Sequence, residues 1–295
     1  GARLARKMSA RTVSAHSECP YAAHAGPDEL VRFGHALQND GRLDAAAGCY
    51  ARTTRLHPAF ADGWFEHGLV LQSLGDLATA VRTFETGLRL RPSDAGRLNA
   101  HGVMLQTAGR HAEARRAYSR SLARAPSNAE AYFNLGTLHE ALGAPADALA
   151  AYRTALEAGA PDEARMHNNI GGVLASQGDL TAAVSAYGES VEADPGFADG
   201  WYNLGNVLLG MGRLSEAEAP LRRALRVAPR HEKAARKLRQ LAAEQLRPTQ
   251  AEFEAEQQVA ALESAVDACA DDSACLQGMT TEADARREAD GPLVV

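Results

Sequence analysis

Apolar residues in this chain recur with the spacing of short amphipathic helices. Between residues 27 and 231, large apolar side chains stand three and four positions apart within short segments, and polar side chains fill the positions between them. That spacing places the apolar residues on one face of an α-helix, which must pack against another element. Glycine and proline separate the segments at regular intervals, so the pattern predicts helix pairs joined by tight turns.

Two glycines in each segment set the period of the chain. The first glycines are Gly34, Gly68, Gly102, Gly136, Gly171 and Gly205, and the second are Gly41, Gly75, Gly109, Gly143, Gly178 and Gly212. Both series advance by 34 residues, with one step of 35 residues after Gly136. We call the first series the register glycines. We expect them where two helices approach closely, and the second series where the chain turns.

Other residue types keep the same period. Twelve residues after each register glycine stands an alanine, and sixteen after it stand Tyr50, Phe84, Tyr118, Tyr152, Tyr187 and Leu221. A proline closes each unit, at Pro58, Pro92, Pro126, Pro161, Pro195 and Pro229. Because proline cannot continue a helix, each unit ends where the next one begins.

This register resembles that of the tetratricopeptide repeat family. Its pattern of Trp, Gly, Ala, an aromatic residue and Pro is met by Trp64, Gly68, Ala80, Phe84 and Pro92. The resemblance implies an all-α fold, a right-handed superhelix of stacked antiparallel helix pairs with a C-terminal helical extension. We expect six units, at 27–60, 61–94, 95–128, 129–163, 164–197 and 198–231, then a capping helix at 232–247 and an acidic helical tail at 248–295.

One proline and one histidine set depart from the family pattern. Pro220 lies a turn inside the second helix of the sixth unit, where we expect a slight distortion rather than a break. His67, His101, His139 and His167 occupy positions where the register places core or packing residues. We interpret these histidines as packing residues, and the sequence contains no nucleophile elbow, phosphate-binding glycine loop or zinc-protease helix. We therefore expect no enzyme activity, no cofactor and no metal site.

Charge divides the chain into three regions. The net charge is −6; residues 1–26 carry four basic residues against Glu18, giving +3, and residues 248–295 carry eleven carboxylates against two arginines, giving −9. The repeat array is neutral by difference, which argues against nucleic acid as a partner. No apolar run reaches the roughly 18 residues needed to cross a bilayer, so we expect a soluble protein of the cytoplasm or an organelle. Residues 1–26 form either a disordered, flexible leader or part of an organelle transit sequence.

Two rows of side chains on the first helices are candidates for binding a partner. Two residues before the register glycines stand Asn134, Asn169 and Asn203. An amide carries both a donor and an acceptor, so a row of them can bind the backbone of an extended peptide. The row resembles the asparagine ladder in the repeat domain of O-linked N-acetylglucosamine transferases, whose catalytic domain is absent from this chain. The resemblance implies peptide binding in a concave groove.

The neighbouring row alternates apolar and amide residues. Phe65, Phe133 and Tyr202 offer side-chain pockets to a bound peptide, while Asn99, Asn168 and Asn206 add polar contacts. The alternative for both rows is packing between helices, where asparagine and aromatic side chains are also common.

The C-terminal region offers a second helix and a cysteine pair. Apolar residues at Phe253, Val259, Leu262 and Val266 predict an amphipathic helix at 250–269, packed either on the end of the array or on a partner. Cys269 and Cys275 form either a disulfide, which implies an oxidising compartment, or two free thiols. Cys19 and Cys49 have no metal-binding spacing.

The sequence thus predicts a non-enzymatic scaffold that binds an extended protein segment in the groove of the array. One alternative is a structural subunit of a large, organellar assembly, held by its outer face and its termini. Another is the regulatory part of an enzyme whose catalytic domain lies elsewhere.

Overall fold

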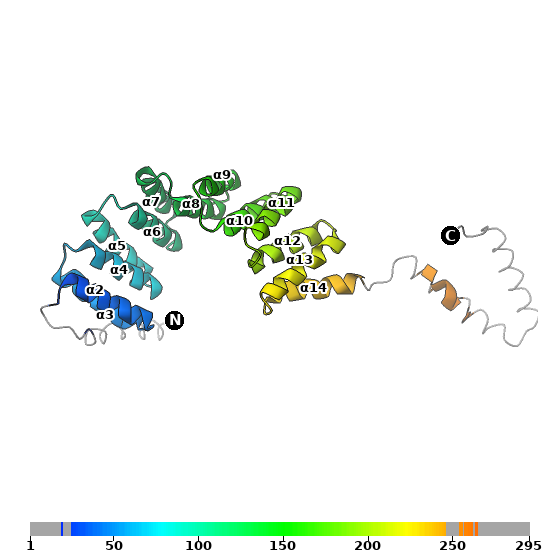
Figure 1. Cartoon of the computed structure of the whole chain (residues 1–295), viewed down its shortest axis with the longest axis horizontal. Coiled ribbons are helices and arrows are strands. Elements are labelled where there is room, and N and C mark those ends of the chain that lie inside the picture. Colours follow the sequence, from blue (N-terminus) through cyan, green and yellow to red (C-terminus); the bar gives the residue numbers. More distant parts are fainter. Residues whose placement is uncertain (1–18, 20–24, 246–253, 256, 262, 265–295) are drawn as a thin grey trace, which may run out of the picture. The chain divides into compact units, whose positions relative to one another are not determined.

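The computed structural model describes residues 19, 25–245, 254–255, 257–261 and 263–264, and within them the chain forms stacked helix pairs (Figure 1). The first helices of the pairs are α2 (Pro27–Asn39), α4 (Ala61–Ser73), α6 (Ala95–Thr107), α8 (Ala129–Ala141), α10 (Glu163–Ser176) and α12 (Ala198–Gly210). The second helices are α3 (Leu43–Leu56), α5 (Leu77–Leu90), α7 (His111–Arg124), α9 (Pro145–Glu157), α11 (Leu180–Ala193) and α13 (Leu214–Val227), and α14 (Glu232–Gln245) follows. The predicted all-α solenoid is confirmed.

Each register glycine lies against a large side chain of the second helix in its pair. A Cβ atom on Gly102 would stand 2.4 Å from the ring of Tyr118, far inside contact distance. A Cβ atom on any of the other register glycines would stand 2.4–3.0 Å from the side chain of the residue sixteen positions later. The second glycines adopt φ angles of 69° to 85°, the left-handed region that a residue with a Cβ avoids. Both expectations for the two glycine series are confirmed.

The two irregularities of the register are accommodated locally. The additional residue of the 35-residue step lies in the turn between α9 and α10, where Gly159 adopts a φ of 78°. Pro220 is buried inside α13, and the helix continues through it from Leu214 to Val227. Neither irregularity interrupts the stacking of the helix pairs.

The apolar core is a series of clusters along the array. One cluster joins the second, third and fourth units and includes Phe65, Phe84, Leu98, Tyr118 and Leu138, each with no exposed surface. Separate clusters lie further along, around Tyr152 and Ile170 and around Tyr187 and Val207. Each unit therefore buries its apolar face against its neighbours, as repeat proteins do.

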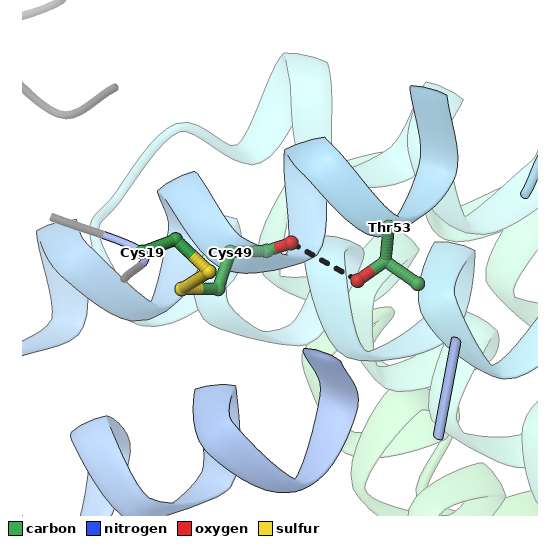
Figure 2. Close-up of a disulfide and its surroundings, with 3 residues drawn as sticks. All are labelled: Cys19, Cys49 and Thr53. Carbon is green, nitrogen blue, oxygen red and sulfur yellow. Dashed lines mark hydrogen bonds between the residues drawn. A yellow bond between two sulfur atoms is a disulfide. The ribbon is translucent and has the colours of Figure 1, made fainter. Parts of the chain in front are cut away.

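A disulfide that the sequence did not lead us to expect joins Cys19 to Cys49 (Figure 2). Their Cα atoms are 5.4 Å apart, and Cys49 on α3 has no exposed surface. Thr53 donates a hydrogen bond of 3.0 Å to the Cys49 carbonyl one turn back. The two cysteines are 30 residues apart, so only the fold brings them together.

The chain divides into two compact units, Gly1–Ala234 and Ala235–Val295. In the region predicted as an amphipathic helix, residues 254–255, 257–261 and 263–264 are helical. Cys269 and Cys275 lie outside the described residues, so their pairing stays a prediction. Among the described helices, none has the length and apolar character that spanning a bilayer requires.

Candidate protein-binding surface

The predicted asparagine row lies on the first helices of the last three pairs. We use the name first-helix face for two sets of side chains: those two and three residues before the register glycines, and those in contact with them. Asn134 on α8, Asn169 on α10 and Asn203 on α12 are each half-buried. Partial exposure leaves these amides accessible while their contacts with neighbouring units fix their orientation.

Two of these asparagines connect adjacent units. The side-chain amide of Asn134 donates to Asn99 Oδ1 at 3.1 Å, joining α8 to α6, and that of Asn203 donates to Asn168 Oδ1 at 2.8 Å, joining α12 to α10. The same bond thus recurs at the same register position. An amide has two N–H groups and a carbonyl oxygen, so each of these bonds uses one N–H and leaves the second N–H and the oxygen for another partner.

Asn169 takes part in a different contact, through a tyrosine. Its amide nitrogen lies 3.4 Å from the hydroxyl of Tyr152, and that hydroxyl donates to a Glu140 carboxylate oxygen on α8. Burial, and then the hydrogen bond to Glu140, raise the pKa of Tyr152. The hydroxyl therefore stays protonated and ties the second helix of its unit to the first.

Hydrogen bonds of this type from tyrosine were not predicted, although a regular spacing in the sequence indicates them. Tyr50 donates to Gln38 and Tyr118 donates to Gln106, the latter at 2.9 Å, and in each case the acceptor lies twelve residues before the tyrosine. Gln or Glu stands four residues after the register glycine in the first four units. These bonds hold the two helices of a pair together at the first-helix face.

Two predicted peptide contacts are not accessible. Phe65 has no exposed surface: its ring centre lies 4.9 Å from that of Phe84, and the guanidinium of Arg97 covers it at 4.8 Å. Asn99 is 4% exposed and already accepts the bond from Asn134. Because neighbouring side chains cover both residues, we leave them out of the proposed peptide contacts.

The remaining candidates are partly exposed. Phe133, Asn168, Tyr202 and Asn206 are all half-buried. The Arg165 guanidinium lies 5.7 Å from the centre of the Phe133 ring, and the centres of the Tyr202 and His231 rings are 5.0 Å apart. Both aromatic rings therefore present part of their surface beside the asparagine row.

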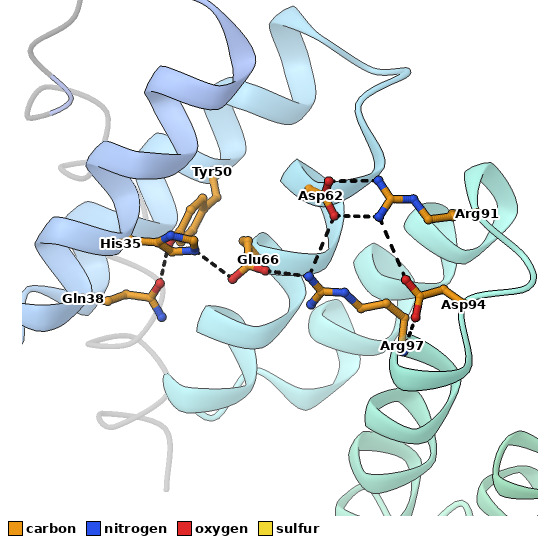
Figure 3. Close-up of polar contacts among 8 residues, drawn as sticks. All are labelled: His35, Gln38, Tyr50, Asp62, Glu66, Arg91, Asp94 and Arg97. Atoms are coloured by element: carbon orange, nitrogen blue, oxygen red, sulfur yellow. Dashed lines mark hydrogen bonds and ion pairs between the residues drawn. The ribbon is translucent and has the colours of Figure 1, made fainter. Parts of the chain in front are cut away.

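In the second unit, Glu66 stands at the register position that asparagine occupies in the last three units (Figure 3). Glu66 on α4 lies between two basic groups: one carboxylate oxygen is 3.1 Å from His35 Nε2 on α2, and the other is 3.1 Å from an Arg97 nitrogen on α6. The Glu66 side chain is 15% exposed, so this pairing offsets the cost of its partial burial.

A second ion pair extends the network toward the turn between α5 and α6. Arg91 forms two parallel hydrogen bonds to the Asp62 carboxylate, at 3.0 and 2.9 Å (Figure 3). Asp94 accepts a bond from the backbone N–H of Arg97 and so caps α6. The first-helix face therefore has two halves, one of acidic and basic groups around Glu66 and Asp62, and one of amides and aromatics on α8, α10 and α12.

The histidines lie within the helix packing. Burial lowers the pKa of His67 to about 4, and it also lowers the pKa of His101, whose ring stacks on Phe84 at 6.0 Å between centres. In the described part of the chain, no cluster of three His, Cys, Asp or Glu side chains has the geometry to hold a metal ion.

Several solved structures share this fold at low sequence identity. PilW, a widely conserved type IV pilus biogenesis factor, has a TM-score of 0.63 and 18% identity over 72% of this chain and 98% of its own. The Pseudomonas aeruginosa pilF structure has a TM-score of 0.59 and 16% identity over 74% and 97%. The Cut9–Hcn1 hetero-tetramer of the APC/C has a TM-score of 0.59 and 15% identity over 80% and 46%. At these identities the likeness shows the fold alone.

The family is identified by sequence models rather than by a single relative. No curated protein matches the chain. A model of the tetratricopeptide repeat matches residues 31–95, 100–162 and 143–198, and a second one matches residues 174–242. Because the first model alone covers more than half of the chain, the chain belongs to the tetratricopeptide repeat family.

Proposed function

We propose that this chain is a protein-interaction scaffold without catalytic activity, which binds an extended segment of a partner protein along the first-helix face of α8, α10 and α12. One observation carries the proposal: Asn134, Asn169 and Asn203 are half-buried at one register position, and their contacts within the array leave amide groups for a ligand. Family membership supports the scaffold role, since repeat arrays present long exposed surfaces.

Binding energy requires the aromatic residues as well as the amides. A hydrogen bond contributes about 0.5–1.5 kcal/mol net, so three asparagines supply roughly 2–4 kcal/mol, which corresponds to millimolar affinity or weaker. Phe133 and Tyr202, both half-buried, lie beside the row and provide apolar surface that a bound segment can cover. We therefore assign the anchoring role to these two rings and the orientation of the peptide backbone to the asparagines.

The two ends of the Asn99–Asn134 bond provide a matched test. Asn134→Ala and Asn99→Ala both break the same bond between units, but only Asn134 is accessible to a partner. The full chain is used as bait in affinity purification with quantitative mass spectrometry. The amount of each partner recovered with the unmodified chain should be unchanged with Asn99→Ala and lower with Asn134→Ala. It should be lower still when Asn169→Ala and Asn203→Ala are added. Equal recovery with both single variants, at equal melting temperatures, contradicts the proposal.

The competing functions give different outcomes in the same experiment. If the chain is a subunit held by its outer face and its termini, the asparagine variants retain every partner, and deletion of residues 248–295 removes them. If the chain is the regulatory part of an enzyme, the recovered partners include an enzyme at a constant molar ratio to the chain.

A further inference from the structure

A cavity lies on the side of the array formed by the second helices, apart from the asparagine row. It has a volume of about 460 Å³ and lies between α5, α6 and α7. Its apolar lining includes Leu88, Leu105 and Ala117, and its rim carries Arg89, Arg116 and Arg120. The cavity is large enough for one or two side chains of a bound segment.

The two carboxylates at this cavity share one arginine. Arg110 forms two hydrogen bonds of 2.7 Å to Glu113 and also lies 3.8 Å from Glu85. Arg116 and Arg120, by contrast, are exposed and form no ion pair or hydrogen bond with any other described residue. The four arginines at and beside the cavity, Arg89, Arg110, Arg116 and Arg120, outnumber the two carboxylates, so a net charge of +2 lies next to apolar surface.

A buried polar side chain points to a ligand at the same place. His101 is 8% exposed, lines the cavity, and neither of its ring nitrogens has a hydrogen-bond partner within the described residues. Its Nε2 is 3.6 Å from Glu85 Oε1, beyond hydrogen-bond distance. Buried polar groups normally have partners, so this ring is a donor that an incoming group can satisfy.

A second cavity further along the array carries a different set of charges. A cavity of about 590 Å³ between α9, α10 and α11 is lined by residues at matching register positions. There Ser185 and Glu189 stand where the first cavity has Arg116 and Arg120. Ile170 takes the register position of His101 in this second cavity. His167 lines the cavity from three positions earlier, with its Nδ1 2.9 Å from a Glu189 oxygen.

We propose that the cavity between α5, α6 and α7 is a second docking site, and that its occupant is an acidic segment of a partner protein that carries an apolar side chain between carboxylates. The carboxylates pair with Arg116 and Arg120, one of them accepts a hydrogen bond from the His101 ring, and the apolar side chain covers Leu88 and Leu105. Charge complementarity selects this occupant, since the second cavity has Ser185 and Glu189 in place of Arg116 and Arg120. The site uses none of the residues of the asparagine row.

The probe for this site is a fluorescein-labelled peptide of repeated Glu-Leu-Glu units, with a Gln-Leu-Gln peptide as the uncharged control. Binding to the full chain is measured by fluorescence anisotropy at physiological salt. Arg116→Glu with Arg120→Glu should weaken binding at least about tenfold, because two charge-assisted contacts become repulsive. Arg115→Glu with Arg124→Glu changes the charge of the same helix equally, outside the cavity, and should weaken it less than about threefold.

The histidines locate the bound peptide independently of these variants. With isotopically labelled histidine, the probe should shift the NMR signal of His101, raise its pKa and leave the signal of His167 in place. If the unmodified chain does not bind the probe, if both arginine pairs weaken binding equally, or if His101 is unaffected, the proposal is overturned. Equal competition by a single-stranded DNA of the same charge also overturns it, since the cavity then selects charge alone. Arg116→Ala with Arg120→Ala replaces the glutamate pair if that pair alters the circular dichroism of the chain.

Discussion

At five of the six register glycines, a hydrogen atom in place of a side chain lets an aromatic ring lie against the helix backbone, and at Gly205 it does so for Leu221. Four of these rings, such as Tyr118 against Gly102, have no exposed surface, and Tyr187 is 6% exposed. This contact could be predicted from the sequence because both partners lie within one unit and keep a fixed separation. The burial of Phe65 and Asn99 could not, because it depends on how neighbouring units rotate over each other and on where Arg97 comes to lie.

A single methyl group tests this close approach. Gly102→Ala would place a Cβ 2.4 Å from the Tyr118 ring, and we expect it to lower the free energy of unfolding by about 1–3 kcal/mol despite the better helix propensity of alanine. Gly96→Ala on the same helix meets nothing closer than 3.5 Å and should be neutral or slightly stabilising. Urea unfolding of both variants measures the difference, and equal effects would show that the contact is not tight.

Because burial lowers the pKa of His67, we expect the free energy of unfolding to fall in acid. His67 has a pKa of about 4 in the folded chain and about 6.5 when unfolded, so below pH 6.5 the unfolded state binds the additional proton. The free energy of unfolding should therefore fall as the pH is lowered from about 6.5 toward 4, by at most about 3 kcal/mol from this residue. Leucine occupies the same register position in the fourth and sixth units.

His67→Leu should remove this part of the pH dependence. The measurement is the shift in urea midpoint between about pH 7.5 and about pH 5, which should be smaller in the variant than in the unmodified chain. An unchanged shift would mean that His67 titrates alike in the folded and unfolded states.

On the scale of the helices, the predicted pairs and turns match the structure, and the contacts that join one pair to the next were not foreseen. The six first helices and six second helices follow from glycine, alanine and proline spacing within a unit. The asparagine bonds between α6 and α8 and between α10 and α12 join residues 35 positions apart, and the Cys19–Cys49 bond joins α3 to a segment before the first unit. Spacing within one unit carries no information about such partners.

The disulfide should stabilise the first helix pair selectively. A crosslink that closes a loop of this length contributes about 2–4 kcal/mol, and Cys49 is fully buried. Reduction should accelerate amide hydrogen exchange in α2 and α3 before it does so in α10 and α12. The Cys19→Ser, Cys49→Ser variant should show this faster exchange without reductant and should not respond to it further. Uniform exchange along the array in both redox states would contradict a local role.

On the scale of the whole molecule, several apolar clusters along the array contribute to its stability. The two halves of the first-helix face differ in their side chains. The first-helix face passes from acidic and basic groups around Glu66 and Asp62 to amides and aromatic rings on α8, α10 and α12. The half with charges satisfies its own groups, because Glu66 has two basic partners and Asp62 has a bidentate arginine. The half with amides keeps unused donors and acceptors, and for that reason we assign the partner segment to it.

The most direct test of this assignment is photo-crosslinking from the two sides of the last unit. The photoreactive residue p-benzoylphenylalanine replaces Tyr202, which is half-buried on the first-helix face, or Arg222 on α13, whose side chain is 68% exposed. Irradiation of the complex with a partner recovered by affinity purification should yield crosslinks from position 202 to an extended segment of that partner, and none from position 222. Crosslinks from position 222 alone would contradict binding along the asparagine row.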